Sequence, residues 1–79
     1  MTTQEAQEIL ENEEVQNVKS FEEASDLCDA HYDEFRNRST GEVDSSFDEC
    51  ELEEGTLYLF YPPQGVTTWD YLYVMVKKN

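Results

Sequence analysis

TLYLFYPPQGVTTWDYLYVMVK, residues 56–77, is the stretch that decides the fold of this chain. Residues 56–61 and 68–77 are rich in aromatic and β-branched side chains, which favour strands. Pro62, Pro63 and Gly65 lie between them, and such residues interrupt strands and form turns. The stretch therefore predicts two antiparallel strands joined by a loop, a hairpin at the C-terminal end of the chain.

Two amphipathic helices are predicted before this hairpin, over residues 2–16 and 20–37. Each range opens with a hydroxyl residue followed three positions later by Glu, the pattern of a capping box. The two pairs are Thr2 with Glu5 and Ser20 with Glu23. The second helix also has an apolar stripe at i, i+3, i+4, i+7 spacing. The stripe consists of Phe21, Ala24, Leu27, Cys28, then His31 or Tyr32, and Phe35.

The segment between the second helix and the hairpin is polar. Residues 38–46 predict a loop that turns at Gly41, and residues 47–53 predict a short edge strand, where charged side chains limit unwanted pairing. A chain of 79 residues has room for one modest core. We therefore predict a single α+β domain over residues 1–79, with two N-terminal helices packed on a small antiparallel sheet.

Both faces of the predicted sheet carry apolar side chains, because side chains alternate along a strand. One face would be aliphatic, with Leu57, Leu59, Tyr61, Leu72, Val74 and Val76. The other would carry Met75 and five aromatic candidates for partner binding or dimerisation: Tyr58, Phe60, Trp69, Tyr71 and Tyr73. Two helices cover one face, so we expect an aliphatic core and a partly exposed aromatic face. The alternative is that the helices cover the aromatic residues.

No catalytic, metal or cofactor site is predicted. His31, the only histidine, lies beside the apolar stripe, where a packed or half-exposed residue is expected rather than a base or ligand. Cys28 and Cys50 lack CxxC spacing and are expected to be free thiols. The acidic residues between 44 and 51 lack the order and the glycine of an EF-hand loop. We therefore expect a protein that is not an enzyme.

Negative charge is the dominant feature of the composition. The chain has 19 acidic and 5 basic residues, a formal net charge of −14. Solubility alone requires a magnitude of about 2 to 8 in a small domain. Acidic disordered chains lack aromatic residues, whereas 13% of this chain is aromatic, so the charge belongs to a folded domain. The excess charge predicts a surface that binds a basic partner.

The second predicted helix carries an acidic row. Four carboxylates recur at i, i+4, i+7 and i+11, which places neighbours about 5–6 Å apart on one face. The row consists of Glu22, Asp26, Asp29 and Asp33, with Glu34 beside it, and its predicted extension consists of Asp44, Asp48, Glu49, Glu51, Glu53 and Glu54. Its pitch is similar to that of the phosphates in a nucleic-acid strand, which Lys and Arg bind mainly through charge.

In size, charge and mixed helix–sheet build, the chain resembles the acidic nucleic-acid-mimic inhibitors of phages and other mobile elements, of the anti-restriction or anti-CRISPR type. Such proteins share charge rather than sequence, so the resemblance assigns no residue roles. It implies a stoichiometric inhibitor that occupies the basic nucleic-acid-binding surface of a host defence nuclease or CRISPR effector complex. The alternatives are an antitoxin or immunity protein against a cognate nuclease, and an acidic interaction module that uses the aromatic face.

These expectations extend to partners and location. We expect a monomer or homodimer that binds protein, without direct contact to nucleic acid or membrane. No apolar run approaches the roughly 20 residues that span a bilayer. The first residues, MTTQE, lack the basic and apolar regions of a secretory signal. Both features favour a cytoplasmic protein, in the host cell if a phage encodes it.

Overall fold

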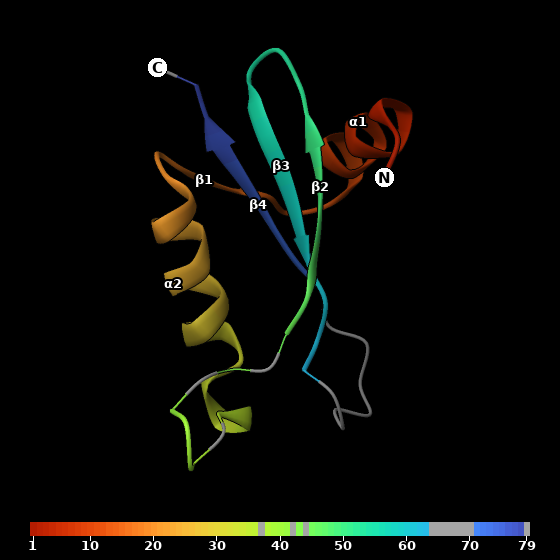
Figure 1. The fold of residues 1–79 in the computed structure, drawn as a ribbon. Coiled ribbons are helices and arrows are strands. Elements are labelled where there is room, and N and C mark those ends of the chain that lie inside the picture. Colours follow the sequence, from red (N-terminus) through yellow and green to blue (C-terminus); the bar gives the residue numbers. More distant parts are fainter. Residues whose placement is uncertain (37, 42, 44, 64–70, 79) are drawn as a thin grey trace.

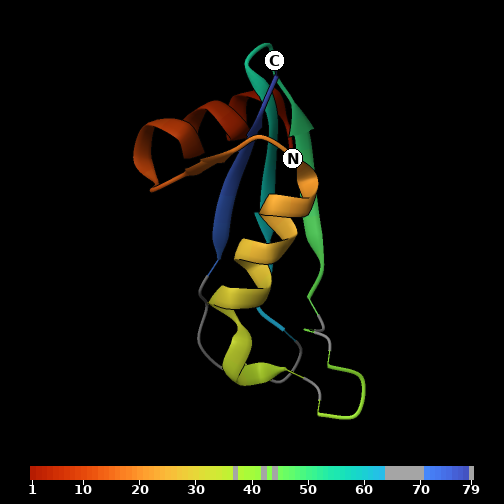
Figure 2. The same cartoon turned by 90° about the vertical axis from the view of Figure 1, so that its left-hand side faces the viewer.

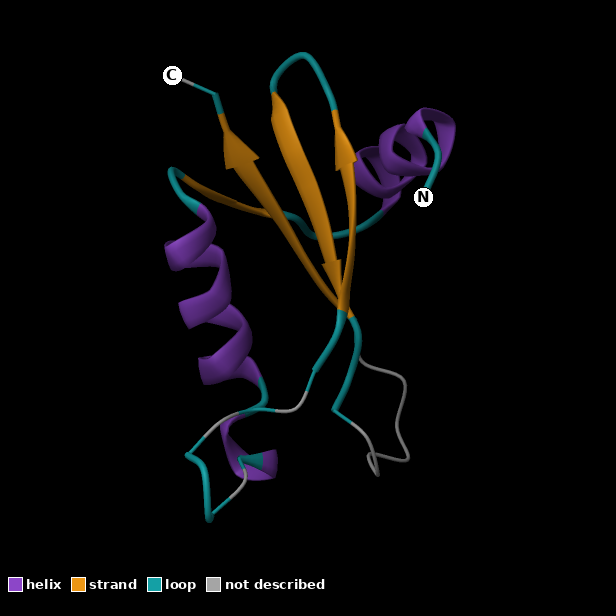
Figure 3. Cartoon of the chain, in the orientation of Figure 1, coloured by secondary structure: helices purple, strands orange, loops and turns teal. Residues whose placement is uncertain are grey.

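The computed structural model describes residues 1–36, 38–41, 43, 45–63 and 71–78. Its elements are α1 (Thr3–Asn12), β1 (Gln16–Val18), α2 (Phe21–His31), the 3-10 turn η1 (Asp33–Phe35), β2 (Phe47–Glu51), β3 (Gly55–Phe60) and β4 (Leu72–Lys77) (Figures 1 and 3). The strands form one sheet in the order β1-β4-β3-β2. The predicted α+β class is confirmed. The sheet is mixed rather than purely antiparallel, because β1 pairs with β4 in parallel.

Both helices begin where the sequence predicts, because each has its cap. The Glu5 backbone N–H donates to Thr2 Oγ1 at 3.1 Å, and the Glu23 N–H donates to Ser20 Oγ at 3.2 Å. The Glu23 carboxylate also accepts a hydrogen bond from the Lys19 backbone N–H at 2.9 Å. Each cap satisfies backbone donors that the first helical turn leaves without intrahelical partners.

Both helices end earlier than predicted. α1 ends at Asn12, and the chain continues into β1, a short strand that the sequence analysis missed. α2 ends at His31, because Tyr32 leaves the helical conformation with φ −107° and ψ 24°. The Tyr32 side chain is buried in the core, and the chain beyond it forms η1. Asp33 therefore lies outside α2.

The β2–β3 hairpin is tight and depends on a glycine. Leu52 and Gly55 exchange two backbone hydrogen bonds, of 2.7 and 3.3 Å, across a two-residue loop. A Cβ atom at Gly55 would lie 2.1 Å from the carbonyl oxygen of Val76 on β4. Only glycine lets the two strands approach this closely. The turn predicted at Gly41 has the positive φ of 73° that favours glycine.

The strand register divides the sheet differently from the prediction. Directly opposed residues of an antiparallel pair lie on the same face. The β3–β4 pairs are Phe60 with Leu72 and Tyr58 with Val74 on one face, and Leu59 with Tyr73 and Leu57 with Met75 on the other. The predicted register was wrong by one residue, a slip that turns every side chain of a strand to the opposite face. Aromatic and aliphatic residues are therefore mixed on both faces.

The predicted aromatic face is consequently not one surface. Tyr58 and Phe60 lie on the face covered by α2, the α2 face, whereas Tyr73 lies on the opposite face, the α1 face. The ring centroids of Tyr71 and Tyr73 are 6.5 Å apart. Trp69 falls outside the described residues. A single exposed face made of these five residues is therefore ruled out by the register.

Each helix covers one face, so the domain has two thin cores (Figure 2). On the α2 face, the buried residues are Ala24, Cys28, Tyr32, Phe60, Leu72 and Val74. On the α1 face, they are Ala6, Cys50, Leu52, Leu57 and Met75. The expectation that both helices share one face was wrong. The free thiols are confirmed, since Cys28 and Cys50 are separated by the sheet. Among the described residues, no helix has the length and hydropathy needed to cross a membrane.

Candidate functional site

The outer side of α2 carries the acidic row. Glu22 and Asp26 are exposed and project away from the side of the helix that buries Ala24 and Cys28. Asp29 is half-buried, because the segment around Gly41 and Val43 comes beside it and the three residues line a pocket with Ser25. The helix thus holds three carboxylates of the predicted row on one side, as their spacing requires.

Asp33 does not continue this helical row. It lies in η1, where its carboxylate accepts a hydrogen bond from Arg36 Nε at 2.9 Å in an exposed ion pair. The Arg36 guanidinium also donates to the Gly41 carbonyl. Arg36 therefore neutralises Asp33 and ties η1 to the following turn. Glu34, the neighbouring candidate, is exposed in η1. We define the acidic row from here on as Glu22, Asp26 and Asp29.

The predicted extension of the row is divided between the two faces of β2. Asp48 pairs with Leu59 and lies on the α1 face, whereas Glu49 and Glu51 pair with residues of the α2 face. Asp44 falls outside the described residues. A continuous strip through all the predicted positions is therefore not formed. Of the described candidates on β2, Glu49 and Glu51 lie on the face that α2 covers.

The Asp48 carboxylate accepts two hydrogen bonds within the chain. The Met1 ammonium donates to its carboxylate at 2.9 Å, and the Glu49 backbone N–H donates to its other oxygen at 2.9 Å. The ammonium hydrogen bond, followed by the Glu49 N–H, lowers the pKa of Asp48. The hydrogen bond to Asp48 and the carboxylate charge raise the pKa of the Met1 amine. Asp48 therefore stabilises the fold rather than offering a free charge.

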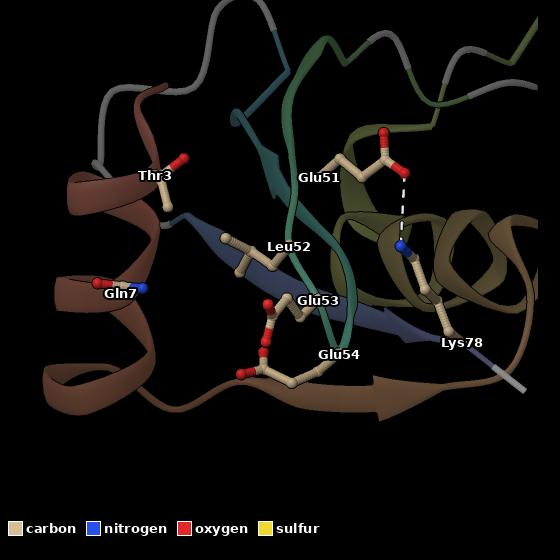
Figure 4. Close-up of a pocket in the computed structure, with 7 residues that line it drawn as sticks. All are labelled: Thr3, Gln7, Glu51, Leu52, Glu53, Glu54 and Lys78. Atoms are coloured by element: carbon tan, nitrogen blue, oxygen red, sulfur yellow. Dashed lines mark ion pairs between the residues drawn. The ribbon is translucent and has the colours of Figure 1, made fainter.

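Glu51 lies at the end of β2 beside an open pocket of about 530 Å³ (Figure 4). Thr3 and Gln7 of α1 line one side, and Leu52, Glu53, Glu54 and Lys78 complete it. Lys78 Nζ lies 3.5 Å from Glu51 Oε1, and Glu53 and Glu54 extend from the hairpin turn. Among the described residues, no three His, Cys, Asp or Glu side chains are arranged to hold a metal ion.

An aromatic patch lies on the α2 face, and sequence reasoning proposed Tyr58 as a binding residue but missed its neighbours Phe21 and Phe47. The Phe21 ring centroid lies 5.4 Å from that of Phe47 and 5.1 Å from that of Tyr58, and the Phe47 and Tyr58 centroids are 5.5 Å apart. Phe21 is 43% exposed and Phe47 is 45% exposed. We name these three residues the aromatic patch. α2 lies against β4 and β1, so β3 and β2 are less covered on this face.

The sequence contained a signal for this patch. Phe21 directly follows the Ser20 cap, so its ring lies at the end of the helix, where less of the sheet is beneath it. Phe35 was also placed in the buried stripe and is 42% exposed, because α2 ends before it. Phe47 stands in a charged segment on an edge strand, and an aromatic residue there has only one neighbouring strand to cover it.

His31 is exposed, whereas a packed or half-exposed residue beside the stripe was predicted. The buried member of the pair is Tyr32, whose ring meets the His31 ring edge-on at 4.6 Å. His31 borders a cavity of about 240 Å³, whose other lining residues are Glu13, Glu14, Gln16, Tyr71, Leu72 and Tyr73. Burial, followed by the charge of Glu13, raises the pKa of the Tyr73 hydroxyl.

Comparison with protein-family models, with curated proteins and with solved structures finds no significant match for this chain. What the surface can do is therefore derived from its own chemistry. It offers carboxylates on a helix, further carboxylates on an edge strand, and exposed aromatic rings between them. Each of these groups binds cations, through charge or through the face of a ring.

Proposed function

We propose that this protein is a stoichiometric inhibitor that occupies a basic nucleic-acid-binding surface of another protein. The acidic row on α2 would take the place of a line of phosphates. The target class that fits is a host defence nuclease or CRISPR effector complex in the cytoplasm, because such proteins hold nucleic acid in positively charged channels. Binding of this kind needs no turnover, metal or cofactor.

The observation that carries the proposal is the unneutralised charge of the acidic row. The ion pairs of the described residues involve Asp33, Asp48 and Glu51, and none involves Glu22, Asp26 or Asp29. These three carboxylates are nevertheless held on one side of a capped helix. Fixed charges that repel one another within the domain lower its stability, and a basic partner would relieve that repulsion.

A second candidate function rests on the aromatic patch. An acidic interaction module would use Phe21, Phe47 and Tyr58 as anchors, since aromatic residues in desolvated pockets dominate many interfaces. The two functions differ in their response to salt. Phosphate mimicry weakens steeply as ionic strength rises, whereas binding through buried rings changes little.

Capture from a cell lysate with matched variants tests the proposal. E22Q/D26N/D29N removes the acidic row, and E8Q/E11Q/E14Q removes the same charge from exposed positions on and after α1. We expect the wild type and the α1 control to retain the same basic protein, and the row variant to lose it. Duplex DNA should elute that protein. Equal capture by all three forms, or no elution by DNA, would contradict the proposal. A captured cognate toxin would instead identify an immunity protein.

A further inference from the structure

β2 is an edge strand whose outward hydrogen-bonding groups can be assigned from the hairpin. Leu52 and Gly55 exchange backbone hydrogen bonds, and the Tyr61 N–H donates to the Ser46 carbonyl at 2.8 Å. Hydrogen-bonded pairs alternate along an antiparallel ladder. The intervening bonded pairs are therefore Cys50 with Leu57 and Asp48 with Leu59. The N–H and C=O groups of Phe47, Glu49 and Glu51 consequently point away from β3, toward the free edge.

The side chains of these same three residues lie on the α2 face. Phe47 belongs to the aromatic patch, and Glu49 lies opposite Tyr58 in the β2–β3 register. The pKa of the Tyr58 hydroxyl is raised, first by burial and then by the charge of Glu49 and a hydrogen bond to Glu49. A strand added to this edge would therefore meet backbone groups, a carboxylate and aromatic rings in one line. In the described part of the chain, no strand pairs with this edge.

Charge decides which strand can be added. A second copy of the chain would place Glu49 and Glu51 against acidic residues of the same edge, and like charges opposed across strands are destabilising. A basic strand would instead place Lys or Arg beside these carboxylates. Its cationic groups could also lie on the faces of Phe21 and Phe47, an arrangement that is favourable for Arg above all.

We infer that the free edge of β2 binds an extended basic segment of the partner protein as an added strand, with Arg or Lys at alternate positions facing the aromatic patch. Main-chain hydrogen bonds to Phe47 and Glu51 hold the segment, and the patch and Glu49 select its cationic side chains. This inference deepens the proposed function, because it names how the same partner is held beside the acidic row. The two surfaces share the α2 side of the molecule.

Along this edge the Glu51 carbonyl accepts a long hydrogen bond from the Cys50 thiol, at 4.0 Å, and among the outward N–H groups it is the Glu49 N–H that has a partner within the chain. It donates to the Asp48 carboxylate at 2.9 Å, and that carboxylate is in turn held by the Met1 ammonium. One of the outward donors is thus already satisfied within the chain. Such internal capping limits non-specific pairing at an edge, which makes charge and aromatic contacts the source of selectivity.

A synthetic peptide in which arginine alternates with valine tests the inference. A peptide of the same composition with its arginines contiguous is the control for charge alone. Amide hydrogen exchange of the full chain should become slower at Phe47 and Glu51 with the alternating peptide and stay unchanged with the contiguous one. Equal protection by both peptides, or no protection at these two amides, would overturn the inference.

Phe47→Ala should weaken binding of the alternating peptide by about tenfold, since it removes an exposed ring from the patch. The Phe47 ring also lies 5.6 Å from the ring of the buried Phe60, so the unfolding temperature of the variant is measured alongside its affinity. Phe35→Ala is the matched control, because Phe35 is 42% exposed but lies in η1, outside the patch. Equal affinity of the two variants would also overturn the inference. The acidic row is intact in both variants, so a failure here leaves the capture experiment with E22Q/D26N/D29N as a separate test of the proposed function.

Discussion

The Met1 ammonium and the Asp48 carboxylate lie 2.9 Å apart, which joins the N-terminus to the edge strand β2. Asp48 also accepts a hydrogen bond from the Glu49 N–H, so one carboxylate accepts hydrogen bonds from two donors. In a chain of net charge −14, this is a carboxylate whose charge is used within the fold. It differs in this respect from the acidic row on α2.

Asp48→Asn should lower the thermal unfolding temperature within a defined pH window. The lowered pKa of Asp48 gives stability that is present above its ordinary value of 3.8 and is lost as pH falls through the folded value. The raised pKa of the Met1 amine gives stability that is present below 8.0 and is lost as pH rises through the folded value. The difference between wild type and variant should therefore be largest between these two limits.

Circular dichroism melts across this range check that prediction. Glu8→Gln, which removes one exposed negative charge from α1, is the control and should be neutral or slightly stabilising because it reduces self-repulsion. If the unfolding temperature of Asp48→Asn stays equally far below that of the wild type in strong acid, the ion pair is not the cause of the difference.

Gly55→Ala should destabilise the domain by about 1–3 kcal/mol, because the added methyl group meets the Val76 carbonyl and must push β3 and β4 apart. Gly41→Asn is the control: nothing lies within 4 Å of a Cβ atom there, and Asn tolerates a positive φ. Urea unfolding measures both. A Gly55→Ala variant as stable as the wild type would mean that the β3–β4 register is wrong.

The sequence predicted those features of the fold that depend on local chemistry. Thr2 and Ser20 mark the helix starts because a capping hydroxyl acts within one turn. It did not predict β1, because Gln16–Val18 is too short and too polar to show a strand period. It also missed the β3–β4 register, because alternation fixes which residues of one strand share a face but not how two strands align across a long loop.

The candidate site was predicted in part for the same reason. Glu22, Asp26 and Asp29 lie together because helical spacing determines their side of α2. Asp33 was lost from the row because Tyr32 turns its ring into the core and ends the helix, a tertiary effect that spacing does not encode. The aromatic patch joins Phe21 to Phe47 across the fold, and such a contact follows only from the packing of α2 on the sheet.

Salt should stabilise the isolated protein. Screening shortens the reach of repulsion among the carboxylates from about 10 Å at 0.1 M to about 3 Å at 1 M salt. The unfolding temperature should therefore rise with sodium chloride, and it should rise less for E22Q/D26N/D29N, which carries less charge. Differential scanning calorimetry measures both slopes. An unfolding temperature that falls with salt would indicate that attractive ion pairs outweigh the repulsion.

Neutralising the acidic row should slow association with the captured partner by about tenfold or more, because steering depends on long-range charge. The dissociation rate should change less. E8Q/E11Q/E14Q removes an equal charge from exposed residues outside α2, so it separates an effect of the acidic row from an effect of net charge. Surface plasmon resonance at low salt gives both rates. If both variants associate with the partner equally slowly, the effect belongs to net charge, and the acidic row is not part of the binding site.

The most direct measurement of phosphate mimicry is competition at equilibrium between this protein and duplex DNA for the captured partner. If the acidic row occupies the partner's nucleic-acid-binding surface, each ligand displaces the other, and E22Q/D26N/D29N fails to displace DNA at concentrations where E8Q/E11Q/E14Q succeeds. Fluorescence anisotropy of labelled DNA reports the displacement. A ternary complex, in which the partner holds the DNA and this protein together at full occupancy, would contradict the proposed function.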